Sequence, residues 1–75
     1  MKATKAGVIK QAKKYMGIID GMEVLSKNKT DQLMNEIMSL YDNVYCGIEP
    51  DKAGEPHFVV CSSKTKSIFL DMPVR

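Results

Sequence analysis

One histidine and two cysteines are the side chains of this sequence best suited to bind a metal or to act in catalysis. His57 and Cys61 are four residues apart and Cys46 lies upstream, while Glu49 or Asp51 could supply a further ligand. Structural zinc sites normally use four ligands arranged as two close pairs, and the two cysteines are not a close pair. On a regular strand, residues four apart share a face but lie about 13 Å apart. The sequence therefore predicts no metal site.

A catalytic cysteine needs a base that removes its proton, and His57 is the only histidine of the chain. Cys46 and His57 could meet in the fold, but the sequence supplies no recognisable oxyanion hole and no residue that would orient the histidine. Gly17 and Gly21 do not show the pattern of a phosphate-binding loop, which follows a strand and opens a helix. We therefore expect neither an enzyme nor a cofactor.

The positive charge is concentrated at the start of the chain. The first 14 residues carry five lysines and no acid, whereas residues 15–56 carry eight acids against three lysines. Lys10, Lys13 and Lys14 fall on one face of an expected helix and could follow a phosphate backbone. Arg75 is the only arginine, so the arginine forks that read bases are not provided. A solvated helix face explains the same lysines, and nucleic-acid binding through them is the alternative function.

Two segments of the chain repeat one spacing of apolar residues, and this spacing lines one face of a helix. The first predicted helix runs from a cap at Thr4 to about residue 20, with Gly21 beyond its end. The second runs from a cap at Asn28 or Thr30 to Gly47. The apolar positions are Val8, Ile9, Ala12, Tyr15, Met16 and Ile19 in the first segment and Leu33, Met34, Ile37, Leu40, Tyr41 and Val44 in the second. We expect these two faces to meet in the core.

Two β-prone runs, residues 58–61 and 67–70, flank a polar connection and predict a hairpin. Residues 22–25 form either a short third strand or a linker, and residues 47–56 are rich in turn-forming types. The predicted fold is therefore one small α+β domain, residues 1–75. It has two amphipathic helices followed by a C-terminal antiparallel β-hairpin.

The predicted hairpin is apolar on both faces, which two helices packed on one side cannot easily cover. A turn centred on residues 64 and 65 places three large side chains on one face, namely Phe58, Val60 and Phe69. Either one helix covers each face, or these three residues form a contact patch for a protein partner. The sequence thus predicts a protein-interaction site at these residues, with homodimerisation as its simplest form.

The longest apolar run is about four residues, against the roughly 20 of a membrane span, and no signal-peptide pattern is present. We expect a cytoplasmic protein with free thiols. Its size and its lack of catalytic groups suit an inhibitor or adaptor of a host or phage protein, acting without a cofactor. The predicted function is therefore that of a protein-interaction module. Weak salt dependence of binding would distinguish it from a nucleic-acid-binding protein.

Overall fold

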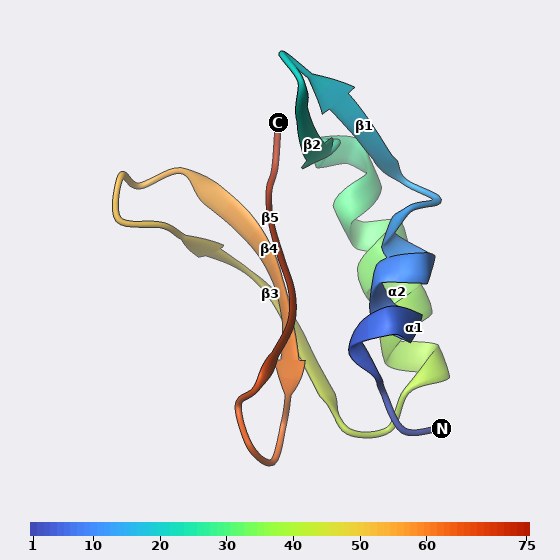
Figure 1. Cartoon of the computed structure of the whole chain (residues 1–75). Helices are drawn as coiled ribbons and strands as arrows, with labels where there is room; N and C mark the ends of the chain where they lie inside the picture. Colours follow the sequence, from blue (N-terminus) through green and yellow to red (C-terminus); the bar gives the residue numbers. More distant parts are fainter.

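The computed structural model describes all 75 residues, which form two α-helices, one 3-10 turn and five strands (Figure 1). In chain order the elements are α1 Lys5–Ala12, β1 Met16–Ile19, β2 Met22–Leu25, η1 Lys27–Lys29, α2 Thr30–Leu40, β3 Val44–Pro50, β4 Pro56–Ser62 and β5 Ile68–Pro73. The chain is a small α+β protein, but the predicted arrangement is wrong. The two helices are separated by a hairpin and are followed by a three-stranded sheet, not by a C-terminal hairpin.

Helix α1 ends much earlier than the apolar spacing predicts. Thr4 caps it as expected, because its Oγ1 accepts a hydrogen bond from the N–H of Gly7 at 3.1 Å. Residues 16–19, predicted as helix, instead form β1 and pair with β2. Asp20 and Gly21 have φ angles of 52° and 76°, which is the backbone of a two-residue hairpin turn. Residues 16–25 therefore form a hairpin around this turn, although the apolar spacing of residues 8–19 predicted a helix. The strand that was one of the two predictions for residues 22–25 is the second strand of this hairpin.

Helix α2 buries Leu33 and Ile37 completely, as predicted, but it too ends early. Tyr41 already has an extended backbone, with φ −120° and ψ 141°. The segment from Val44 onwards, predicted as the end of the helix and a loop, is β3. Val44 and Ile48 are β-branched and Tyr45 is aromatic, and these residue types favour strands.

Strands β3, β4 and β5 form an antiparallel sheet in that order. The predicted pairing of Cys61 with Ile68 is present. One extra residue, Phe69, then shifts the register, so that Val60 faces Leu70 and not Phe69 as predicted. Strand β3 gives the β4–β5 hairpin the support that an isolated hairpin lacks.

The two sheets are joined where the chain ends. Leu25 of β2 and Val74 form a parallel bridge, and the N–H of Arg75 donates to the carbonyl of Leu25 at 2.9 Å. The strands therefore follow one another in the order β3, β4, β5, β2, β1, with β1 and β3 as the two outer edges (Figure 1).

Both helices pack on the same side of the three-stranded sheet (Figure 1). The core between them consists of eleven residues: Val8, Ala12, Leu25, Leu33, Ile37, Tyr41, Val44, Phe58, Val60, Met72 and Val74. Six of the twelve apolar positions predicted to meet here are among them, and Tyr15, Met16, Met34 and Leu40 pack against the cluster. Ile19 was predicted in the core but is exposed, because it belongs to β1. Neither helix has the length and apolar character needed to cross a membrane.

Candidate functional site

Of the three residues predicted to form a contact patch, two are fully buried and the third is partly buried. Phe58 and Val60 have no exposed area, and Phe69 is partly buried against the core cluster. The prediction needs this correction because both helices cover the face of the sheet that carries Phe58 and Val60. For Phe58 and Val60 the alternative prediction is right, because the domain covers these two side chains itself.

The three candidate lysines are exposed, but they do not share one helix. Lys10 belongs to the last turn of α1, Lys13 caps the helix and Lys14 lies in the turn that follows. None of them lies within 4.0 Å of a carboxylate, and the same holds for every other lysine of the chain. Their ammonium groups therefore remain available to solvent or to an external anion.

The opposite face of the three-stranded sheet has no helix over it, and we call it the outer face. The register places Tyr45 of β3 beside Cys61 of β4, and Cys61 beside Ile68 of β5. Val59 and His57 follow on the same face of β4. A shallow hollow of about 350 Å³ lies over this face. Nine residues line it: Glu49, Pro50, Asp51, His57, Val59, Cys61, Lys66, Ile68 and Asp71.

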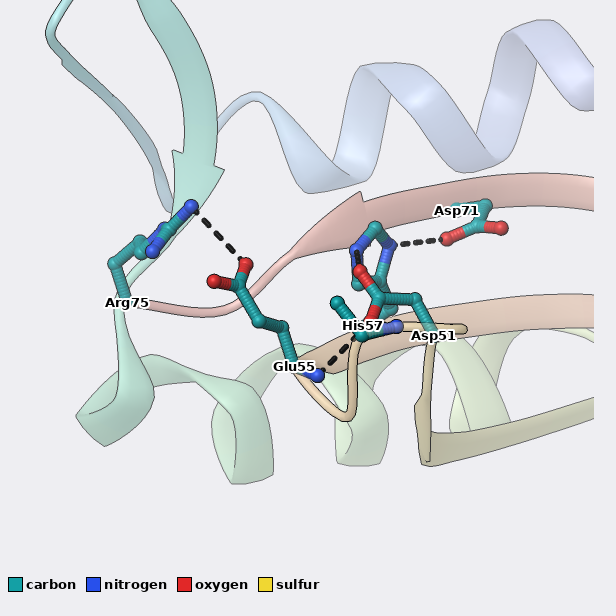
Figure 2. A network of polar contacts seen from close by, with 6 residues as sticks. Asp51, Glu55, His57, Asp71 and Arg75 are labelled. Carbon is teal, nitrogen blue, oxygen red and sulfur yellow. Dashed lines mark hydrogen bonds and ion pairs between the residues drawn. The ribbon is translucent and has the colours of Figure 1, made fainter.

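His57 lies between two carboxylates on the outer face (Figure 2). Its Nδ1 is 2.7 Å from Oδ1 of Asp71, and its Nε2 is 3.2 Å from Oδ2 of Asp51. Asp71 belongs to β5 and Asp51 to the loop between β3 and β4, so the imidazole connects β4 to β5 and to this loop. Both ring nitrogens therefore face carboxylates and not a thiol.

The loop between β3 and β4 is ordered by Asp51, which the sequence analysis treated as a solvated loop acid. Its Oδ1 accepts hydrogen bonds from the N–H groups of Ala53 and Glu55, both at 2.9 Å. The backbone N–H of Glu55, followed by that of Ala53 and by His57, lowers the pKa of Asp51 against the opposing effect of desolvation. Glu55 also contacts Arg75 at 3.3 Å, which ties the loop to the end of the chain (Figure 2). An aspartate three residues before Gly54 was the sequence signal for this turn.

The two thiols lie on opposite faces of the sheet and are free. Tyr45 faces Cys61 across the β3–β4 ladder, so the next residue, Cys46, points to the helix side. Burial, and to a lesser extent Cys61, raises the pKa of the Cys46 thiol to about 11. This thiol is therefore protonated and unreactive at neutral pH. The structure brings together no cluster of three histidine, cysteine or acidic side chains that could hold a metal ion.

A second polar contact, which the sequence analysis missed, connects the turn after α1 to α2. The Tyr15 hydroxyl donates a hydrogen bond to Oε1 of Glu36, and this bond, with smaller effects of burial and of the Glu36 charge, raises the pKa of Tyr15. Oε2 of Glu36 is buried without a hydrogen-bond partner. Lys14 and Glu36 both line a cleft of about 390 Å³ between the helices.

No protein-family model, curated protein or solved structure matches this chain.

Proposed function

We propose that this protein is a protein-binding module that docks its partner on the outer face and performs no catalysis. The observation that carries the proposal is the exposure of Tyr45 and Ile68, at 49% and 56%, on a sheet face that no helix covers. An antiparallel sheet with one wet face normally carries polar residues there. Exposed apolar side chains gathered on such a face are typical of a contact surface.

The contacts of His57 support the proposal because they hold the outer face in one shape before binding. Its two carboxylate partners belong to the loop before β4 and to β5, so one side chain ties three segments together. A surface that is ordered beforehand loses less conformational entropy when a partner docks. The partner then contacts a rigid hollow and not a mobile loop.

The charges around the hollow indicate what the partner presents. Glu49, Asp51 and Asp71 line it, against Lys66 and the histidine. Of the three acids, Glu49 has no ion-pair partner in the chain. A protein surface with an apolar side chain for the centre and a lysine or arginine for the rim complements this pattern. An inhibitor or adaptor that acts by covering such a surface needs no cofactor.

Capture of partners from lysate of the native source, treated with nuclease, tests the proposal when three forms are compared. Wild-type protein should retain a defined set of proteins, and Ile68→Glu should lose it because a charge enters the apolar centre of the hollow. Met38→Glu is the matched control, since Met38 is equally exposed but lies on α2. Retention of the same proteins by Ile68→Glu contradicts the proposal.

Nucleic-acid binding is the second candidate, favoured by the observation that no lysine is engaged in an ion pair. Lys10, Lys13 and Lys14, with Lys2 before α1 and Lys5 at its first position, could make five phosphate contacts. Affinity for duplex DNA would then fall with salt at a log–log slope of about −4.5. A flat salt response, or no binding at low salt, removes this candidate.

A further inference from the structure

Strand β1 is an open edge of the sheet. It pairs only with β2, and three of its four residues are exposed. Figure 1 shows β2 between β1 and the C-terminal end of the chain, with nothing along the other side of β1. Ile18 is 73% exposed, the highest value among the large apolar side chains. Ile19 and Met22, beside the turn, are also exposed.

The backbone of β1 offers hydrogen-bonding groups at this edge. The carbonyl of Leu25 accepts from Arg75 and so points away from β1. Leu25 faces Met16 in the β1–β2 register, and in an antiparallel pair both facing residues then direct their N–H and C=O groups outward. Ile18 is two residues further along β1, so its N–H and C=O groups also point outward. Met16 and Ile18 therefore present two donors and two acceptors at the edge.

Natural proteins protect such edges with charged residues, proline or a bulge, and β1 has none of these. The other edge strand, β3, contains Glu49 and ends at Pro50. The two outer edges are therefore unequal, and β1 is the one suited to accept another strand.

We infer that a second copy of this chain pairs with β1 in antiparallel orientation, with Gly17 facing Gly17 of the second copy at the twofold axis. Met16 then faces Ile18 of the second copy, so that the outward N–H and C=O groups of one residue meet those of the other and can form hydrogen bonds. Glycine at the axis has no side chain to separate the strands. The pairing extends the sheet across both molecules.

The charges at the two ends of β1 favour this occupant and this register. Lys14 precedes the strand and Asp20 follows it. An antiparallel pair centred on Gly17 brings the end of each β1 that follows Lys14 near the end of the other that precedes Asp20, whereas a parallel pair would bring like charges together. The arrangement is self-complementary, as a twofold interface requires.

A four-residue strand pair is smaller than a standard stable interface, so the dimer should form only at high protein concentration. Sedimentation over a range of about 10 µM to about 1 mM should show a shift from monomer to dimer in wild type. Ile18→Lys should stay monomeric throughout, and Ile48→Lys, on the β3 edge, should dimerise like wild type. A wild type that stays monomeric, an Ile18→Lys dimer, or loss of the dimer in Ile48→Lys would each overturn the inference.

The charge pairing has its own test. Added salt should weaken the wild-type dimer, whereas in Lys14→Glu, where acids gather at each end of the strand pair, added salt should strengthen what association remains. Lys52→Glu makes the same charge change in the loop after β3 and should respond like wild type. A salt response of Lys14→Glu that equals that of wild type contradicts this register.

Amide hydrogen exchange tests the β1 pairing on the wild-type protein. On going from low to high concentration, the amides of Met16 and Ile18 should become more slowly exchanging, because the second copy supplies their acceptors. Those of Gly17 and Ile19 already bond to β2 and should change less. Equal protection of all four amides would overturn the inference. Partner binding at the outer face involves other residues, so loss of the dimer in Ile18→Lys and loss of partner in Ile68→Glu report separately.

Discussion

The β1–β2 and β4–β5 hairpins are both rich in apolar residues, yet the fold uses them in opposite ways. Strand β4 lies between two strands and under two helices, so Phe58 and Val60 have no exposed surface. Strand β1 has a neighbour on one side only, and Ile18 and Ile19 are exposed. Both strands are apolar and both pair, but only the strand with further strands and helices packed around it has its side chains buried.

The turns of the two hairpins differ in length and in what holds them. Asp20 and Gly21 alone connect β1 to β2, and both have positive φ. The β4–β5 connection is longer, and the Ser62 Oγ accepts from the N–H groups of Lys64 and Thr65 at 3.2 Å each. The register of the first hairpin depends on its turn, whereas burial of one face also fixes the register of the second.

The largest difference between the two hairpins is expected in the free energy of unfolding when each loses one apolar side chain. Phe58→Ala removes a fully buried ring from β4 and should lower the free energy of unfolding by about 3–5 kcal/mol, a large share of the stability of so small a domain. Ile18→Ala in β1 should change it by less than about 0.5 kcal/mol. Denaturant titrations at low protein concentration compare the two. A large loss of stability in Ile18→Ala would show that β1 is packed by the rest of the fold.

The turn of the β1–β2 hairpin should respond to a single methyl group. Gly21→Ala forces an alanine to φ +76° and should cost about 1–2 kcal/mol. Gly17→Ala is the control in the same hairpin, because a Cβ there meets no atom within 4 Å. Thermal unfolding of both variants separates turn strain from the general effect of alanine. Equal melting temperatures would mean that the turn does not hold the hairpin.

The contrast between the hairpins also explains what the sequence could predict. Residues 58–61 and 68–70 are strands whose connection is polar, and helix α2 has its buried face where the spacing put it, at Leu33 and Ile37. The β1–β2 hairpin was missed because the apolar spacing of residues 8–19 fits a helix as well. The Asp20-Gly21 pair between Ile19 and Met22 was the contrary signal, and it was interpreted as a helix end.

The outer-face site was beyond sequence reasoning for a physical reason. His57 contacts Asp51 because the loop after β3 folds back over the sheet, and it contacts Asp71 because the extra residue Phe69 shifts the β4–β5 register and turns Asp71 to the face of His57. With residues 44–47 assigned to a helix, the sequence offered no strand beside residues 56–62 that would lead into Asp51. The two thiols are free, and their placement on opposite faces follows from the same unpredicted strand.

The outer-face contacts should make stability depend on acidic pH. Because the pKa of Asp51 is lowered in the folded state, its contribution is present above the ordinary aspartate value of about 3.9 and is lost as pH falls through the lower folded value. Wild type should therefore melt above Asp51→Asn near neutral pH, and the gap should narrow below about pH 4. Glu23→Gln on β2, whose carboxylate has no ion-pair partner, should show no such convergence. A gap that widens on acidification would have the wrong sign.

The smallest effect on stability is expected from reversing the charge of Lys10, Lys13 and Lys14 together. These side chains are exposed at the end of α1 and in the turn that leads to β1, and no carboxylate lies within 4.0 Å of them. Surface changes of this kind usually cost within about 0.5 kcal/mol each. The denaturation midpoint of the triple glutamate variant should therefore stay close to that of wild type, well above that of Gly21→Ala. If it falls as far as Gly21→Ala, the lysines stabilise the approach to β1 through attraction to Glu23 and Glu36, and added salt should then destabilise wild type but not the variant. If the fold is kept while binding to DNA or RNA is lost, the lysine segment is a contact surface, and nucleic-acid binding replaces protein binding as the leading function.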